Sequence, residues 1–378
     1  MKRFFSGCLI LIWIFSLMPL GARAAALEVE AKSAILMDAA TGTVLFEQNA
    51  HEALPPASVT KVMTMLLIME AIDSGRIGWE DTVTASEAAA QKGGSQIYLK
   101  VGETMCVRDM VKSIAVASAN DCACAMAEHI AGSETAFVEQ MNTRAKELGM
   151  QDTHFVNCTG LDDDPAAKNH KTSAHDIALM SRELMVNHPD IKQYTTIWMD
   201  TVRNGEFGLS NTNKLVRFYP GATGLKTGFT SQAGHCLSAT AQREDMELIA
   251  VVMGCESSAK RFAACKQLLD HGFANYALVT PDAQEGEVPV RLGTLDRVKA
   301  VLAENGALLI DKSQKNLITT EMTLEPQVDA PVSKGQRLGT FTIKAGDQIL
   351  KQIPMVAETE VPRLTLGQIF WEILKSIF

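Results

Sequence analysis

The chain of 378 residues is 47% hydrophobic and 21% charged and contains only 12 prolines, a composition that excludes a disordered, collagen-like or polytopic membrane protein. Its length predicts about two globular domains, enough for at least one large hydrophobic core. The formal net charge of −9 disfavours nucleic acid as a partner, because such binding depends on a broad basic surface.

The first residues have the pattern of a secretory signal peptide. Two basic residues precede a largely apolar run from Phe4 to Leu20, and Ala22-Arg23-Ala24 provides the small residues of a cleavage site. We expect residues 1–24 to be removed on export, which leaves 32 basic and 44 acidic side chains. The mature protein is therefore expected in the cell envelope.

The next segments predict a hairpin followed by helices. Residues 34–47 contain two short β-prone runs around the turn Ala40-Thr41-Gly42. A buried helix is expected from near Ser58 to Gly75, because its apolar residues recur at a spacing close to 3.6. A largely helical stretch is then expected from about residue 107 to 183.

Strand-like runs at 237–241 and 248–253 are joined by a polar turn. Because strands lie at both ends of this region and helices lie between them, we predict an α+β domain over residues 25–276. Its antiparallel sheet is formed by the two ends and covered by helices. Short β-rich runs separated by Gly and Pro predict a small all-β domain over residues 281–358.

The last residues, 362–378, predict an amphipathic helix. Spacings of three and four place Leu366, Ile369, Phe370 and Ile373 on one face, with polar residues mostly opposite. A helix of this length is too short to cross a bilayer and would place Glu372 in the hydrocarbon core. We therefore expect it to lie on the outer face of the cytoplasmic membrane, with packing on the β domain as the alternative.

The cysteines and histidines do not predict a metal site. Seven cysteines remain after residue 24, an odd number that cannot all pair, and none of their spacings repeats the Cys-x-x-Cys of a zinc site. Buried free thiols are favoured over a disulfide framework. His170 and His175 are interpreted as polar surface groups or as groups that support catalytic neighbours, and no metal or other cofactor is expected.

Chemistry enters with Ser58-Val59-Thr60-Lys61, a Ser-x-x-Lys at the start of an apolar helix. The hydroxyl and the amine lie one helical turn apart, so the amine can activate the hydroxyl if burial lowers its pKa. Alone the motif is weak, because Ser257-Ser258-Ala259-Lys260 is a second match in the same chain. Ser257 is interpreted as a surface or cap residue, since it follows the other motifs instead of preceding them.

Two further tripeptides change the interpretation. Ser118-Ala119-Asn120 provides a hydroxyl and an amide, although in isolation it reads as a helix cap. Lys226-Thr227-Gly228 provides a cation and a hydroxyl on an expected edge strand. The order Ser-x-x-Lys, Ser-x-Asn, Lys-Thr-Gly is the signature of the penicillin-recognising serine enzymes, which have a β-lactamase-like fold.

Within that superfamily the mature chain closely resembles the low-molecular-weight D-alanyl-D-alanine carboxypeptidases of bacterial cell-wall metabolism. This serine peptidase family includes penicillin-binding protein 5 and its sporulation relatives. The resemblance differs at two positions: Ala119 replaces a common glycine, and Phe229 stands where some members have histidine. It extends over the three motifs and over Gly160-Leu161, Thr172-Ser173-Ala174-His175-Asp176, Asn211-Thr212-Asn213 and Gly224 to Thr230.

The resemblance implies an acylation and deacylation cycle on peptidoglycan stem peptides that end in D-Ala-D-Ala, inhibited by β-lactam antibiotics. Ser58 would be the nucleophile and Lys61 its base, with the oxyanion between the backbone N–H groups of Ser58 and Phe229. Ser118 and Lys226 would return the proton to the leaving amine. The remaining substrate contacts would come from Asn120 to an amide and from Thr227, beside Gly228, and Arg261 to the terminal carboxylate.

Three alternatives remain open. A D,D-endopeptidase that cuts crosslinks uses the same residues. A class A β-lactamase needs a deacylating glutamate, and Glu183 with Asn187 offers only a superficial match on a core helix. A non-catalytic wall-binding protein would be expected to lack at least one of Ser58, Lys61 and Lys226, and this chain has all three.

Overall fold

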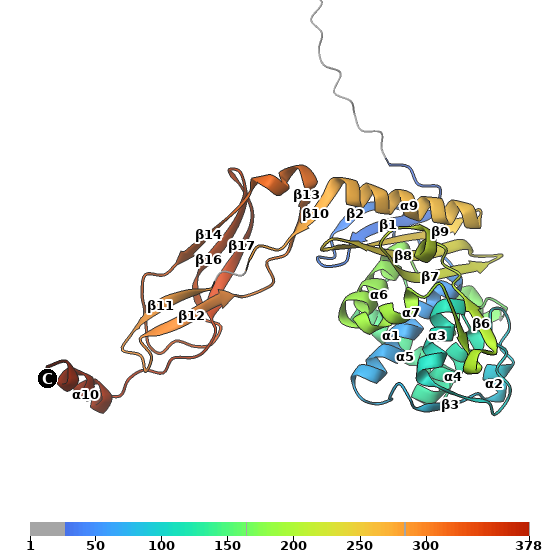
Figure 1. Cartoon of the computed structure of the whole chain (residues 1–378), viewed down its shortest axis with the longest axis horizontal. Coiled ribbons are helices and arrows are strands. Elements are labelled where there is room, and N and C mark those ends of the chain that lie inside the picture. Colours follow the sequence, from blue (N-terminus) through green and yellow to red (C-terminus); the bar gives the residue numbers. More distant parts are fainter. Residues whose placement is uncertain (1–26, 164, 283–284, 378) are drawn as a thin grey trace, which may run out of the picture.

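The computed structural model describes residues 27–163, 165–282 and 285–377, which form two lobes (Figure 1). The larger lobe holds the elements from β1 to α9, and the smaller lobe holds β11 and the strands that follow it. Between the lobes, β10 (Tyr276–Val279) pairs with β13 (Leu308–Asp311). The expected signal peptide, residues 1–24, lies outside the described residues.

The larger lobe is organised around one antiparallel sheet of order β2-β1-β9-β8-β7. The sheet joins the two ends of this region, as the sequence predicts. Helices cover both faces of the sheet (Figure 1), so every residue of β1 is buried. Its strands are β1 (Ser33–Asp38), β2 (Val44–Gln48), β7 (Ala222–Thr230), β8 (Gly234–Arg243) and β9 (Met246–Cys255).

One long helix, α9 (Ser258–Asn275), covers the face of the sheet to which Ala34 and Leu36 contribute. The opposite face, to which Ile35 and Met37 contribute, packs on the other helices. This alternation follows from the two-residue period of a strand. The longer helices on that face are α1 (Lys61–Asp73), α3 (Val107–Ala117), α4 (Asn120–Ala131), α5 (Glu134–Glu147) and α6 (Ala174–Asn187).

Short elements complete the larger lobe. The single-turn helices are α2 (Glu87–Ala90), α7 (Lys192–Thr195) and α8 (Leu215–Phe218). Two hairpins pair β3 (Thr82–Thr84) with β4 (Thr104–Cys106), and β5 (Met199–Val202) with β6 (Phe207–Ser210). The 3-10 turns are η1 (Ala57–Thr60), η2 (Pro165–Asn169), η3 (Pro189–Ile191) and η4 (Arg203–Gly205).

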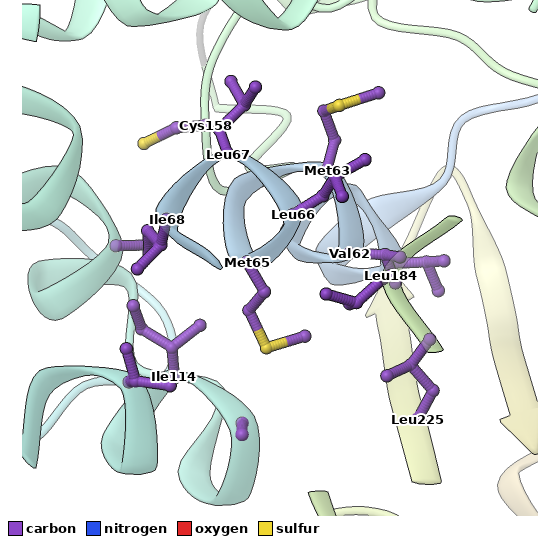
Figure 2. Packing of buried hydrophobic residues seen from close by; sticks show 14 of the residues in the cluster. Val62, Met63, Met65, Leu66, Leu67, Ile68, Ile114, Cys158, Leu184 and Leu225 are labelled. Atoms are coloured by element: carbon purple, nitrogen blue, oxygen red, sulfur yellow. The ribbon is translucent and has the colours of Figure 1, made fainter. Parts of the chain in front are cut away.

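Helix α1 lies at the centre of the core. Ten of its 13 residues are buried, so it is apolar on all sides and is a core helix, as expected. Figure 2 shows its side chains pointing in several directions, with Ile68 toward Ile114 and Val62 toward Leu184. The expected start near Ser58 needs one correction: residues 57–60 form the 3-10 turn η1, and the α-helix begins at Lys61.

The expectation of a largely helical stretch from 107 to 183 is wrong for residues 148–173. Among the described residues of this segment, η2 is the single helical turn, and the rest is an irregular loop. Gly149, Gly160 and Pro165 interrupt any helical pattern, and both glycines adopt positive φ. This loop passes beside the start of α1, which becomes important below.

The smaller lobe is all β, as predicted, and has its own core around Val288, Phe341 and Ile353. Its sheet has the order β14-β16-β17-β12-β11-β15, and η5 (Lys312–Leu317) precedes β14. The strands are β11 (Gly286–Arg291), β12 (Arg297–Leu302), β14 (Ile318–Leu324), β15 (Val328–Asp329), β16 (Arg337–Ala345) and β17 (Gln348–Ala357).

The chain ends in the expected helix, α10 (Leu366–Ile377), on the side of the smaller lobe away from the larger one (Figure 1). Leu366, Phe370 and Trp371 are 87%, 61% and 64% exposed. Across the described ranges, no helix combines the length and the apolar character needed to span a membrane.

Candidate active site

Ser58 and Lys61 meet at the junction of η1 and α1. Lys61 Nζ lies 2.9 Å from Ser58 Oγ and donates a second hydrogen bond of 2.9 Å to the backbone oxygen of Thr159. Ala57, just before the serine, has a φ of +48°, a left-handed conformation that strains a residue with a Cβ. The local backbone therefore departs from a regular helix at the residue that precedes Ser58.

The Lys61 amine is completely buried, and within the described residues its hydrogen-bond partners are two neutral oxygens. Burial lowers the pKa of Lys61 from 10.5 to about 7, against the opposing influence of Cys158 and Asp121. At neutral pH a large fraction of the amine is therefore uncharged. An uncharged amine at hydrogen-bond distance from a hydroxyl can take its proton.

The Ser-x-Asn tripeptide lies where α3 ends and α4 begins. Ser118 ends α3 with a φ of +64°, and Asn120 is the first residue of α4. Asn120 Nδ2 donates to the Gly93 oxygen at 2.7 Å, but its Oδ1 is buried and has no partner among the described residues. Because a buried amide oxygen without a partner costs free energy, this atom is suited to accept a hydrogen bond from a bound ligand.

The Lys-Thr-Gly tripeptide lies on β7, which is an edge strand of the sheet, as expected. Lys226 is buried and donates to the backbone oxygen of Thr227 at 2.9 Å. Burial, then the charges of Lys61 and Arg261, hold the pKa of Lys226 well below its usual value. Thr227 Oγ1 donates to Thr212 Oγ1 at 2.7 Å.

Gly228 allows β7 to approach residues 57–61, named here the nucleophile turn after the expected role of Ser58. A Cβ at this position would lie 2.7 Å from the Pro56 oxygen and 3.1 Å from the Ser58 nitrogen. Only glycine permits that contact without a shift of the backbone. The next residue, Phe229, is 58% exposed and stacks on His235 with ring centroids 4.3 Å apart.

Arg261, in the first turn of α9, reaches the same strand from the other side. Its Nη1 donates to the Gly228 oxygen at 2.9 Å and to the Cys236 oxygen at 3.4 Å. Its Nε is buried without a partner among the described residues. Burial lowers the pKa of Arg261, and no carboxylate of the described chain forms an ion pair with it.

The residues that compete in sequence have other tasks. Ser257 caps α9 by accepting a hydrogen bond from the Lys260 nitrogen, so the second Ser-x-x-Lys is structural, as expected. Glu183 lies on α6 and forms an ion pair with Arg144 at 2.6 Å. That ion pair leaves no free carboxylate at Glu183.

Two groups of polar residues raise the question of metals. Glu70, Glu183 and His188 lie close together, but Arg144 forms ion pairs with both glutamates, so a cation already occupies this cluster. All cysteines of the described residues except Cys106 are buried, and burial raises the pKa of Cys122 and Cys158 well above that of a free thiol. Neither group resembles a reactive or metal-binding centre.

Sequence reasoning missed contributions that have no side-chain signature. Thr159 contacts Lys61 through its backbone oxygen, and Gly160 is needed because a Cβ there would lie 1.8 Å from the Ala57 oxygen. Asp121 is buried and accepts hydrogen bonds from the Ile97 and Leu99 nitrogens, which fixes the loop beside Asn120. His170 is buried, so the part of its interpretation that placed it on the surface is wrong.

Comparison with protein families gives two matches. Residues 21–257 match the family described as D-alanyl-D-alanine carboxypeptidase. Residues 273–363 match the family described as the C-terminal domain of penicillin-binding protein 5. Together the two matches cover most of the chain and change from one to the other across α9.

Individual relatives agree with this division. The chain is 41% identical over 376 residues to D-alanyl-D-alanine carboxypeptidase DacF of Bacillus subtilis, covering 96% of this chain and 95% of the relative. It is 35% identical to DacC of Escherichia coli, covering 88% and 85%. Penicillin-binding protein 5 of Haemophilus influenzae superimposes with a TM-score of 0.77 at 29% identity, covering 89% of this chain and 98% of that structure.

Proposed function

The chain belongs to the D-alanyl-D-alanine carboxypeptidase family of serine peptidases, and we propose that Ser58 is the nucleophile through which it acts. It is a serine-type D-alanyl-D-alanine carboxypeptidase, whose substrates are peptidoglycan stem peptides ending in D-Ala-D-Ala and whose family binds β-lactams. The observation that carries the proposal is the contact of 2.9 Å between Ser58 Oγ and the buried Lys61 amine.

Acylation begins when the neutral Lys61 amine takes the Ser58 proton and Oγ attacks the carbonyl carbon of the penultimate D-Ala. The backbone N–H groups of Ser58 and Phe229 hold the oxyanion, a role supported by the approach of β7 to the nucleophile turn. The peptide C–N bond then breaks. The proton passes by way of Ser118 and Lys226 to the leaving amine, and terminal D-Ala departs.

Deacylation repeats the proton transfers with water in place of the leaving amine. Water attacks the ester carbon and gives a proton to Lys61. Lys61 returns that proton to Ser58 Oγ as the Ser58–acyl bond breaks, which releases the shortened peptide and restores the neutral amine. Asn120 holds a backbone amide of the substrate throughout, which its unpartnered Oδ1 supports. No metal or other cofactor enters these steps.

The terminal carboxylate of the substrate is held by Thr227 and Arg261. Lys61, Lys226 and Arg261 are buried cations or potential cations, and none of them forms an ion pair within the described residues. Buried charge without a counter-ion is costly, so a substrate carboxylate would complete the site electrostatically. This arrangement favours a substrate with a free C-terminus.

We further propose that the protein is exported and that α10 holds it on the outer face of the cytoplasmic membrane. Helix α10 has 12 residues and would span roughly 18 Å, less than a hydrocarbon core of about 30 Å. Leu366, Phe370 and Trp371 are largely exposed, and an interfacial helix would bury them among lipid headgroups.

Mass spectrometry after exposure to a labelled penicillin tests the nucleophile. The expected result is one covalent adduct on Ser58 that is lost in Ser58→Ala. The matched control is Ser257→Ala, which changes the other Ser-x-x-Lys and should keep the adduct. An adduct on Ser257, or no adduct on folded protein, would reject the assignment.

A further inference from the structure

His170 lies behind the nucleophile turn, only 4% exposed, with its ring edge-on to Phe155 at 5.6 Å. Its two ring nitrogens contact different segments of the chain. Nε2 is 2.8 Å from Thr60 Oγ1, and Nδ1 accepts a hydrogen bond of 3.0 Å from the Val156 nitrogen. The imidazole therefore bridges η1 and the irregular loop after α5.

The two partners determine the protonation state of the ring. Thr60 Oγ1 gives its only proton to the Ala57 oxygen at 2.8 Å, so it must accept from His170, and Nε2 carries a proton. The Val156 N–H can only donate, so Nδ1 carries none. His170 is thus held as the neutral Nε2–H tautomer.

The two segments that His170 bridges hold the donor and the acceptor of the hydrogen bond between Lys61 Nζ and the Thr159 oxygen. The nucleophile turn supplies Ser58 and Lys61, and the loop supplies the Thr159 oxygen that accepts from the Lys61 amine. The two segments also touch directly, since a Cβ on Gly160 would overlap the Ala57 oxygen. A change in their relative position would move the amine away from Ser58 Oγ or open it to water.

We propose that His170 is a positioning residue for the Ser58–Lys61 pair, holding the loop that carries Thr159 against the nucleophile turn. It acts through Thr60 and Val156 and does not touch the substrate. The inference rests on the proposed function, because it takes Ser58 and Lys61 as nucleophile and base. As a consequence, the Lys61 amine stays within hydrogen-bond distance of Ser58 Oγ and shielded from water.

Electrostatics agree with this assignment. Burial, then the nearby charges of His154 and Lys61, lower the pKa of His170 to about 4, so the ring stays neutral wherever Lys61 can act as a base. Cys158, Asp121 and Lys226 face Lys61 from three other elements. A loosened loop would hydrate the amine and raise its pKa from about 7 toward 10.5.

The test measures the rate of acylation by a labelled penicillin as a function of pH. His170→Asn keeps an acceptor near Nδ1 and loses the donor to Thr60, while His170→Gln does the reverse. Each should slow acylation about 10- to 100-fold, the scale expected when reacting groups are misplaced by about 1 Å. Each should also move the acid limb of the profile to higher pH, which a general loss of stability would not do.

Thr60 provides an independent arm of the test. Thr60→Val removes the hydroxyl between His170 and Ala57 and should both slow acylation and move the acid limb to higher pH. Thr60→Ser keeps the hydroxyl and should show the wild-type rate and acid limb. The matched control is His154→Asn, because His154 is an exposed neighbouring histidine whose hydrogen bonds to Lys171 are made by its backbone. It should match the wild type in rate and in acid limb.

The outcomes separate this inference from the proposed function. Without an adduct on Ser58 in the wild type, the proposed function fails first. With that adduct present, wild-type rates and acid limbs in both His170 variants overturn the inference alone. If the variants do not fold, ¹⁵N NMR of the wild-type histidines decides: a proton on Nδ1, or a charged ring at pH 7, overturns it.

Discussion

The two lobes differ in the burial and ion pairing of their basic side chains. In the larger lobe Lys61, Lys226 and Arg261 are buried without ion-pair partners among the described residues. From residue 286 to 361 of the smaller lobe, Thr342 is the single buried polar side chain, and every charged group reaches solvent. Buried basic groups without an ion-pair partner reduce stability, so their occurrence around the Ser58–Lys61 contact distinguishes the lobe that holds the proposed site from the lobe that does not.

The ion pairs of the smaller lobe show the other side of this contrast. Arg291 and Asp329 pair with both side chains 61% exposed, and Lys344 forms an ion pair with Glu321 on the neighbouring strand. Exposed pairs of this kind contribute little to folding. The stability of this lobe comes instead from its apolar core around Phe341 and Ile353.

The largest effect is expected where a buried polar group touches the nucleophile. Ser58→Ala should abolish release of D-Ala, and Lys61→Ala should slow acylation by 10²- to 10⁴-fold or more, since loss of a general base typically has that effect. Turnover of a soluble D-Ala-D-Ala peptide measures both. Lys260→Ala, in the second Ser-x-x-Lys, should leave turnover unchanged, and a comparable loss there would contradict the assignment.

The next largest effect on turnover is expected from removing the terminal carboxylate of the substrate. If Thr227 and Arg261 hold a free carboxylate, a peptide amidated at its C-terminus should be turned over about 30-fold to several thousand-fold more slowly, which corresponds to roughly 2–5 kcal/mol for an unpaired buried charge. Parallel assays of the acid and the amide measure the ratio. Equal turnover would reject a carboxypeptidase site and favour the endopeptidase alternative.

The features of the larger lobe that depend on local sequence patterns could be predicted from the sequence. Strand-like runs joined by a polar turn predicted β8 and β9, and the spacing of three between Ser58 and Lys61 predicted a contact that the structure contains. The helical pattern failed over residues 148–173, where tertiary contacts with the nucleophile turn determine the backbone.

The rest of the site could not be predicted from one sequence for physical reasons. The Thr159 carbonyl acts through the backbone, which every residue shares, so no residue type marks it. The burial of His170 follows from how η1 packs on a distant loop, 110 residues away in sequence from Thr60. The pairing of β10 with β13 was also not predicted, because it depends on how the chain folds between the two lobes and not on a local pattern.

The pH dependence sharpens the comparison further. Lys61 must be neutral to accept a proton, and its pKa is lowered to about 7 by burial, so acylation should fall as pH drops through 7, by about tenfold per unit below it. Rates of acylation between pH 5 and 9 measure this limb. An acid limb near 10, the ordinary value for an exposed lysine, would show that the amine is hydrated in solution.

A smaller and opposite effect is expected on stability. The pKa of Lys61 is 10.5 when unfolded and about 7 when folded, so the unfolded chain binds the proton more tightly and the cost to folding is complete below pH 7. Lys61→Met should therefore stabilise the larger lobe at pH 7, by up to about 5 kcal/mol before packing differences, and by progressively less as pH rises toward 10.5. Lys344→Met, in the smaller lobe, should change the unfolding midpoint little at either pH; if it matched Lys61→Met, the contrast between the lobes would be wrong.

The smallest effect on turnover should come from removing the end of the smaller lobe. Residues 362–378 include α10, which lies on the side of the smaller lobe away from the larger lobe (Figure 1), so their deletion leaves every residue of the proposed mechanism in place. The truncated protein should move from the membrane to the soluble fraction because the exposed face of Leu366, Phe370 and Trp371 is lost, while turnover of a soluble peptide stays within about twofold. Replacing Gln368 by Ala, on the polar side, provides a control that should remain at the membrane. A truncated protein that stays membrane-bound after export would reject the anchor, and one that unfolds would show instead that this helix packs on the β domain.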